Sequence, residues 1–285
     1  MSIDSTCVCD VYYVTDDRRK LAVDCSISTV NAANLLEPND LSLYVGIPFC
    51  PTRCAYCSFV SRTVGKRTDL IEPYLQALLQ EVEVTGKLLK TTDKKIRTVY
   101  IGGGTPTTLS AQQLTRLLQA ITTHFDLGAC IEFTVEAGRP DTFSDEMLET
   151  LAQKGVDRIS INPQTMKDET LRFIGRHHTV AQTVESFRLA RELGFDDINM
   201  DLIMGLPEET LEDVKNTMEQ IKELKPDNLT VHSLALKRAA RLNIYKDDYK
   251  NYKMVNTKEH MDLVAGYAKE MGLEPYYLYR QKSMA

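Results

Sequence analysis

Tryptophan is absent from this 285-residue chain, and no stretch approaches the ~20 consecutive apolar residues that a membrane-spanning helix requires. The net charge is −6, and no block of like charges is long enough to form a basic stripe for nucleic acid. The first residues, with Asp4 and Asp10, lack the basic and apolar regions of a secretory signal peptide. These absences argue against a membrane span and a nucleic-acid partner, and they favour a cytoplasmic protein.

Cysteine is the residue whose distribution is most informative. Cys50, Cys54 and Cys57 fall within eight residues, and clustered cysteines in a reducing compartment indicate metal binding or catalysis. A structural zinc site would need a fourth ligand, but the chain has no second CxxC pair and the nearest histidine is His124. Three thiolates suit a 4Fe–4S cluster that leaves one iron open, with a zinc half-site as the alternative.

The other four cysteines show no comparable pattern. Cys7, Cys9 and Cys25 lie in a segment without clear periodicity, and their spacing completes no known ligand set. A second metal site there is therefore the less favoured interpretation. Cys130 opens an apolar run and is expected to be a small core residue.

Short β-rich runs alternate with helical patterns from Leu41 onward, which predicts βαβ units and a parallel sheet. Between the runs, apolar residues recur at spacings of three or four, as in Leu114, Leu117, Leu118 and Ile121, which predicts helices that cover the sheet. Six such units fit a partial or complete barrel better than a short open sheet. Residues 1–40 show no convincing pattern and are interpreted as an N-terminal extension. The expected strands are 42–49, 98–101, 131–136, 157–161, 197–204 and 228–233.

Glycine and polar residues gather where these expected strands end. The second strand runs into residues 102–106 (Gly-Gly-Gly-Thr-Pro), the third ends at Glu136, the fourth runs into Gln164, and the fifth contains Asp201. Chemistry in parallel α/β folds collects at the carboxyl ends of the strands. We therefore expect these residues to line one pocket.

The CxxxCxxC spacing directly after the first expected strand is the signature of the radical S-adenosylmethionine superfamily. Residues from about 41 to 280 resemble the oxygen-independent coproporphyrinogen III oxidase-like members, in the bacterial coproporphyrinogen dehydrogenase branch. The match rests on Val-Glu-Ala-Gly-Arg-Pro-Asp, Ile-Ser-Ile-Asn-Pro-Gln and Thr-Val-His-Ser-Leu. The resemblance implies a radical SAM partial (β/α)6-type barrel over residues 41–245. Residues 246–285 would then be the start of a C-terminal region that is truncated relative to the family.

The resemblance also implies two cofactors and the residues that hold them. Cys50, Cys54 and Cys57 would ligate a 4Fe–4S cluster, whose open iron is chelated by S-adenosylmethionine. An electron from the cluster then cleaves the sulfonium to give a 5′-deoxyadenosyl radical. The residues that match positions around S-adenosylmethionine are Tyr44, Tyr56, Gly103, Gly104, Thr105, Glu136, Gln164, Arg176, Asp201 and Ala235.

The implied activity is the oxidative decarboxylation of coproporphyrinogen III to protoporphyrinogen IX without oxygen, with a reduced flavodoxin or ferredoxin-type electron donor. Ser58 and Phe59 stand where the best-characterised oxidases have Gly-Cys, a feature shared with related heme chaperones. A heme-binding chaperone or an inactive fragment is therefore the alternative. Lys237, Arg238 and Arg241 either complement the propionates of a tetrapyrrole or form a solvated basic helix start.

Overall fold

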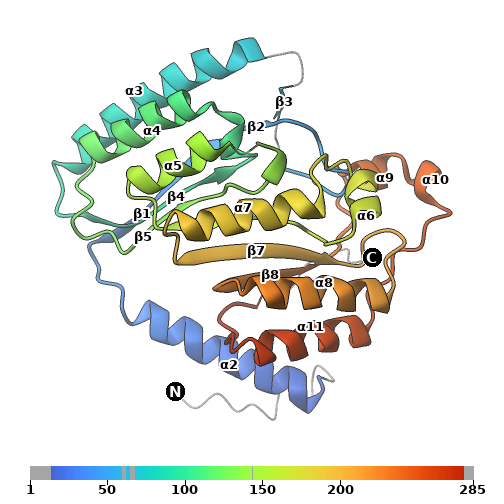
Figure 1. Ribbon diagram of the computed structural model, residues 1–285. Helices are drawn as coiled ribbons and strands as arrows, with labels where there is room; N and C mark the ends of the chain where they lie inside the picture. The colour runs from blue at the N-terminus through green and yellow to red at the C-terminus, as the bar shows by residue number, and fades with distance from the viewer. Residues whose placement is uncertain (1–13, 60–61, 65–67, 143, 279–285) are drawn as a thin grey trace.

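The computed structural model describes residues 14–59, 62–64, 68–142 and 144–278. Its main sheet has six strands, all parallel, in the order β1-β4-β5-β6-β7-β8 (Figure 1). β1 and β8 stand at the two ends of this order, so the sheet is an open arc. The predicted parallel α/β architecture is confirmed. The strands are β1 (Asp40–Ile47), β4 (Lys95–Gly103), β5 (Glu132–Val135), β6 (Arg158–Ser160), β7 (Asp197–Met204) and β8 (Asn228–Ser233).

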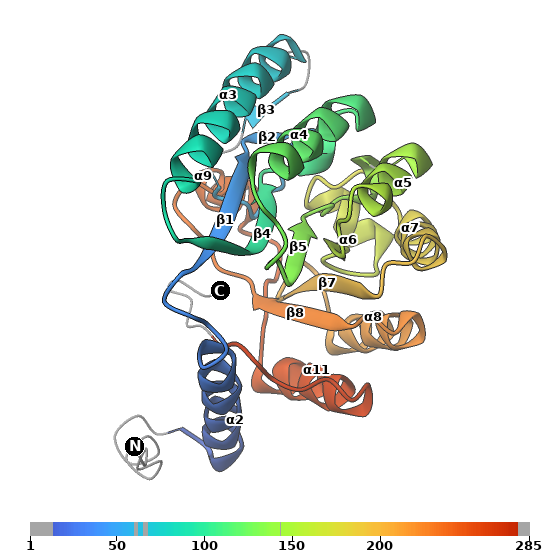
Figure 2. The same ribbon diagram turned by 90° about the vertical axis from the view of Figure 1, so that its left-hand side faces the viewer.

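Helices cover the outer face of this arc, as Figure 2 shows. Their starts are defined by local sequence: Ser110 forms a capping box with Gln113 ahead of α4, and Thr179 forms one with Gln182 ahead of α7. The outer helices are α3 (Ile71–Leu89), α4 (Ala111–His124), α5 (Asp145–Gln153), α7 (Val180–Glu192) and α8 (Leu211–Leu224).

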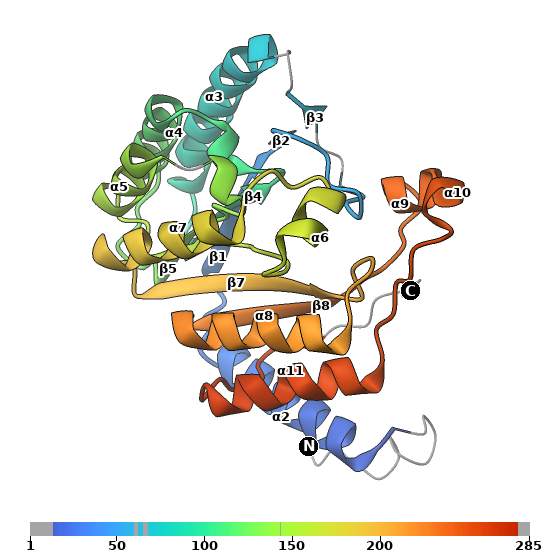
Figure 3. The ribbon, with the colours of Figure 1, turned by 45° about the vertical axis from the view of Figure 1, so that its right-hand side comes forward.

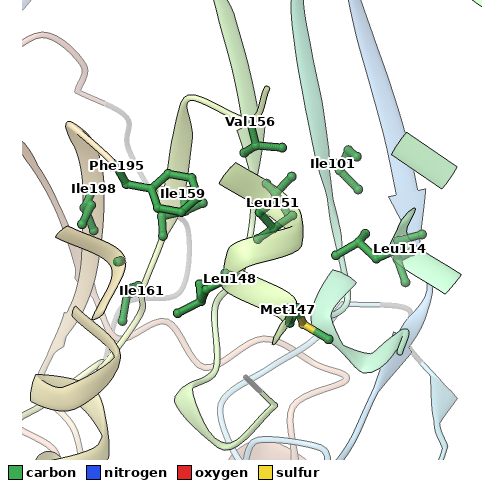
Figure 4. Packing of buried hydrophobic residues seen from close by; sticks show 14 of the residues in the cluster. Ile101, Leu114, Met147, Leu148, Leu151, Val156, Ile159, Ile161, Phe195 and Ile198 are labelled. Carbon is green, nitrogen blue, oxygen red and sulfur yellow. The ribbon is translucent and has the colours of Figure 1, made fainter. Parts of the chain in front are cut away.

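The core lies between the sheet and these helices. Leu148 and Leu151 of α5 belong to the same buried cluster as Ile101 of β4 and Ile159 of β6 (Figure 4). The predicted stripe of α4 is fully buried in this cluster. Burying such a side chain contributes roughly 1.5–3 kcal/mol. This packing fixes the strand ends that carry the polar residues.

Short elements gather at the carboxyl end of the sheet. β2 (Phe49–Cys50) pairs with β3 (Arg62–Thr63) in a separate two-stranded sheet, and α6 (Asp168–Phe173), α9 (Arg241–Ile244) and α10 (Lys246–Tyr249) lie at the same end (Figure 3). The amide of Leu242 in α9 donates to the carbonyl of Ala55 at 3.0 Å, which joins the chain after β8 to the cysteine loop. In the residues that the structure describes, no helix combines the length and apolar character that crossing a membrane requires.

Part of residues 1–40, in which the sequence shows no convincing pattern, is helical. Asp16–Ala33 form an 18-residue helix, α2, which lies beside α11 (Lys258–Glu270) at the base of the molecule (Figure 1). Its apolar residues do not share one face, and only Cys25 is buried, so no helical stripe was visible in the sequence. Tertiary contacts hold it instead: Arg18 pairs with Asp262 at 3.2 Å, and Ser28 donates to the carbonyl of Pro275.

α11 in turn packs against α8, where Lys222 and Glu270 approach to 2.6 Å. The expected divisions after residues 40 and 245 stay predictions. Cys7 and Cys9 lie outside the described residues, so the less favoured second metal site is not tested.

Glu209 is a buried carboxyl group in the loop that leads from β7 into α8. It accepts a hydrogen bond from the hydroxyl of Thr165. Burial raises the pKa of Glu209 from 4.5 to about 7, with Asp213 adding to the rise and Lys167 opposing it. The folded chain therefore binds this proton more tightly than the unfolded chain does. The stability that this proton contributes is complete below the unfolded pKa and is lost as the pH rises through about 7.

We expect Glu209→Gln to reduce the fall in the free energy of unfolding between about pH 5 and about pH 8.5, a fall to which the Glu209 carboxyl contributes about 2.5 kcal/mol in the wild type. Gln keeps an oxygen acceptor for Thr165 but carries no charge at any pH. Chemical denaturation at a series of pH values measures the effect. Glu212→Gln, at an exposed position of α8, should keep the wild-type profile. If the free energy of unfolding of Glu209→Gln falls with pH as steeply as that of the wild type, Glu209 is not the source of the pH dependence.

Candidate functional site

The three clustered cysteines line one cavity of about 410 Å³ at the carboxyl end of the sheet. Its volume lies in the ~300–1,000 Å³ range of small-molecule sites. Cys50 ends β2, and Cys54 and Cys57 follow in the loop that the chain makes before β3. All three are free thiols, and Cys54 is buried. The CxxxCxxC segment is called the cluster loop below (residues 50–57).

The glycine-rich end of β4 supports the cluster loop from one side. The amides of Gly104 and Thr105 donate to the carbonyls of Ile47 and Phe49, both at 2.7 Å. A Cβ on Gly104 would lie 2.5 Å from the carbonyl oxygen of Phe49, so a side chain there would push the two segments apart. The Thr105 hydroxyl also donates to Sγ of Cys50 at 3.5 Å. The glycine run is therefore needed for close backbone approach to the cluster loop.

Glu136 is a half-buried acid directly after β5. Tyr100 donates to its carboxylate at 2.5 Å, and burial, reinforced by Asp201, raises the pKa of Glu136. Gly103, which also lines the cavity, adopts φ +108°, a conformation that favours glycine. Tyr44 does not line the cavity: its ring stacks on Tyr100 at 5.9 Å and is 61% exposed. Tyr44 thus contacts Tyr100, which in turn bonds to Glu136.

Arg176 is buried beneath the cluster loop. Its Nη1 donates to the carbonyls of Gly138 at 3.2 Å and Asn162 at 2.5 Å, which ties together the loops after β5 and β6. Although burial opposes its charge, Tyr56 and Cys54 accept hydrogen bonds from it and raise the pKa of Arg176. Burial raises the pKa of Tyr56 as well. The guanidinium stays charged beside the cysteines.

Gln164 and Asp201 occupy the floor between β6 and β7. Gln164 has φ +71°, which is strained for a non-glycine residue and costs on the order of 1–3 kcal/mol. Two backbone hydrogen bonds of 2.9 Å, to Asp201 and from Ile203, hold it there. The Asp201 carboxylate accepts from the amide of Asn199 at 2.7 Å. These bonds keep Gln164 in the strained conformation, in which it lines the cavity.

The structure therefore brings together all of the predicted site residues except Tyr44. The twelve that line the cavity are Cys50, Cys54, Tyr56, Cys57, Gly103, Gly104, Thr105, Glu136, Gln164, Arg176, Asp201 and Ala235. Their individual roles toward a cofactor stay predictions, as does that of Tyr44.

The sequence pattern missed two cavity residues and identified the cations after β8 only in part. Arg139 and Thr52 line the cavity but were given no role, although Arg139 follows a strand end and Thr52 lies between two cysteines. Of the three cations after β8, Lys237 lines the cavity, whereas Arg238 and Arg241 are exposed and do not. Of the three cations proposed to face a tetrapyrrole, only Lys237 is therefore in the cavity lining. Arg53 of the cluster loop lines the same cavity.

The chemistry of the cavity fits an iron–sulfur cluster. Thr105 and Arg139 point hydrogen-bond donors at the sulfurs of Cys50 and Cys54, the kind of contact that tunes such clusters. Among the described residues, no three His, Cys, Asp or Glu side chains form a group that could hold one metal ion. That finding concerns a single ion, because a cluster distributes its ligands over several iron atoms.

Relatives of known identity resemble this chain over much of its length. It is 42% identical over 247 residues to the oxygen-independent coproporphyrinogen-III oxidase-like protein HemZ of Bacillus subtilis, covering 86% of this chain and 49% of the relative. It is 43% identical over 202 residues to the heme chaperone HemW of Lactococcus lactis, covering 71% of this chain and 50% of that protein. The chain thus spans about half the length of the curated relatives it matches.

A solved structure and a family profile agree with these relatives. The coproporphyrinogen III oxidase HemN from Escherichia coli matches with a TM-score of 0.72 and 28% identity, over 82% of this chain and 53% of that one. The profile of the Radical SAM superfamily matches residues 44–221. The predicted kinship and the predicted cofactors are confirmed: the chain belongs to the radical SAM superfamily, whose members use a 4Fe–4S cluster and S-adenosylmethionine.

Proposed function

We propose that this chain carries the catalytic core of an enzyme that converts coproporphyrinogen III to protoporphyrinogen IX without oxygen. The observation that supports the proposal most directly is the make-up of the cavity. Cysteines, acids and cations from successive strand ends and the cluster loop line one space, with a cationic side formed by Arg53 and Lys237. Coproporphyrinogen carries four propionates, which such a side would complement.

Arg53 and Lys237 line the same cavity, and the cluster loop is bonded to the turn after β8. Nη2 of Arg53 donates to the carbonyl of Ala239 at 2.6 Å, two residues beyond Lys237. This contact places both cations on the side where β8 ends. A carboxylate bound there would lie in the same cavity as the three cysteines.

The reaction removes one hydrogen atom and one carbon dioxide from each of two propionates, and one electron passes to an external acceptor each time. The bound cluster and S-adenosylmethionine supply the radical chemistry. The residues of the chain would hold and orient the bound molecules. Glu136 and Asp201 offer acceptors for hydroxyl or ammonium groups, and Arg176 offers a donor for a carboxylate. Misplacement by about 1 Å can cost about 100-fold in rate, so this positioning decides activity. A cytoplasmic flavodoxin or ferredoxin-type protein would supply the reducing electron.

Lys237→Gln should weaken binding of coproporphyrinogen roughly 10-fold or more, because it removes a charge-assisted hydrogen bond to a propionate. Anaerobic isothermal titration of the cluster-loaded chain with coproporphyrinogen measures the dissociation constant. Turnover to protoporphyrinogen is measured in parallel. Release of 5′-deoxyadenosine without tetrapyrrole should be unchanged.

Arg238→Gln is the matched control, since it removes the neighbouring cation at an exposed position outside the cavity. It should bind coproporphyrinogen as the wild type does. Equal losses of affinity in both variants would mean that only the overall positive potential of the surface affects binding of coproporphyrinogen. An unchanged affinity in Lys237→Gln would remove Lys237 from the substrate site.

A heme chaperone is the second candidate function, and a specific observation favours it. Phe59, which stands in place of the oxidase cysteine, is 72% exposed and lines the cavity. An exposed aromatic ring beside a cationic side suits a flat, propionate-bearing macrocycle. Stoichiometric heme binding without any vinyl product from coproporphyrinogen would favour the chaperone. Vinyl product without heme binding would favour the enzyme.

A further inference from the structure

The guanidinium of Arg139 lies against one of the three clustered cysteines. Its Nη1 is 3.7 Å from Sγ of Cys54, and both side chains are buried, Arg139 to within 3% of full burial. This cation comes from the loop after β5, 85 residues along the chain from Cys54. Water cannot screen a charge at such a position effectively, so its field acts on the sulfur.

Arg139 is held in one orientation by Asp141. Two parallel hydrogen bonds, from Nε at 3.0 Å and from Nη2 at 2.8 Å, join the guanidinium to both carboxylate oxygens of Asp141. Burial opposes the charge on Asp141, but hydrogen bonds from His178 and Arg139 hold the pKa of that carboxyl below its usual range. The carboxylate thus occupies one edge of the guanidinium and leaves Nη1 for Cys54.

The same nitrogen also fixes the cluster loop. Nη1 of Arg139 donates to the hydroxyl of Thr52 at 2.9 Å, and that hydroxyl donates to the carbonyl of Gly175 at 3.0 Å. Thr52 lies between the first two cysteines, so the contact sets where Cys54 stands. Arg139 therefore touches the cluster loop at two points, the backbone-anchored Thr52 and the Cys54 sulfur.

We propose that Arg139, oriented by Asp141, is a positioning residue of the iron–sulfur site: it holds Cys54 in place and raises the reduction potential of the bound cluster. A cation and a hydrogen bond near a cluster sulfur stabilise the reduced, more negative state more than the oxidised one. This role concerns the cluster and not the substrate, so its test is independent of the proposed decarboxylation.

The test is a redox titration of the reconstituted cluster, followed by electron paramagnetic resonance. Arg139→Gln should shift the midpoint so that, at a given potential, the ratio of reduced to oxidised cluster falls about tenfold, or about 59 mV for one electron. Arg139→Lys keeps the charge and should shift the midpoint less. Arg158→Gln is the matched control, because Arg158 is also an ion-paired arginine of the sheet, with Glu132 and Asp197 as partners, but does not line the cavity.

Asp141→Asn provides an effect of opposite sign. It removes the negative charge on the far edge of the guanidinium and should raise the midpoint, whereas Arg139→Gln lowers it. Opposite shifts would support the proposal, because a purely structural role predicts no dependence on the sign of the charge. If Arg139→Gln loses its iron, the midpoint of Arg139→Lys decides: it should lie below that of the wild type, and an unchanged midpoint would overturn the proposal. Unchanged midpoints in both variants, or equal shifts in Arg139→Gln and Arg158→Gln, would overturn the proposal.

Discussion

Cys54→Ala should give a chain that folds but retains almost no iron after anaerobic reconstitution, against about four irons per wild-type chain. Cys54 is one of the three thiols that line the cavity among the residues that the structure describes, and a cluster left with two protein ligands is not held. Cys50→Ala and Cys57→Ala should behave in the same way. Iron and sulfide analysis, the visible absorbance of the cluster and the loss of 5′-deoxyadenosine release measure the result.

Cys25→Ala and Cys130→Ala are the matched controls for this expectation. Cys25 lies on α2 and Cys130 lies just before β5, and neither lines the cavity. Both variants should keep nearly four irons and the wild-type absorbance. Retention of the full iron content in Cys54→Ala, or zinc in place of iron after anaerobic expression of the wild type, would contradict the cluster assignment.

Arg176→Ala should weaken binding of S-adenosylmethionine roughly 10- to 150-fold, as the loss of a charge-assisted hydrogen bond of ~1.5–3 kcal/mol predicts. The structure adds a second effect. The carbonyls of Gly138 and Asn162 lose their buried donor, which costs about 1–3 kcal/mol for each group left unpaired. Isothermal titration of the cluster-loaded chain measures the affinity, and denaturation of the apo chain measures the stability.

Arg172→Ala, on the exposed surface of α6, is the control for Arg176→Ala because its partner is the equally exposed Glu169. It should change neither affinity nor stability appreciably, since exposed ion pairs contribute little. A loss of stability in Arg176→Ala with unchanged affinity would make Arg176 a structural residue of the cavity wall. Unchanged affinity together with unchanged stability would contradict both roles.

Local sequence predicted most of the fold that positions the site. The expected strands 197–204 and 228–233 coincide with β7 and β8, because short segments in which apolar or β-branched residues recur between turn residues are local signals. The apolar stripe of α4 is a buried helix face, and the spacing of its residues is likewise a local signal. α2 escaped prediction because its residues carry no stripe, and its position depends on contacts such as that between Arg18 and Asp262.

The sequence by itself determined the chemistry of this protein: the spacing of Cys50, Cys54 and Cys57 after a strand is enough to indicate an iron–sulfur loop. Local spacing also indicated which strand ends face the pocket, since parallel strands all end on one side. Only the tertiary structure decided which groups touch. It placed Tyr44 behind Tyr100, kept Lys237 in the cavity while Arg238 is exposed, and brought Arg139 to Cys54. Such contacts join loops from different strands, and they depend on the curvature and register of the sheet, which no local pattern encodes.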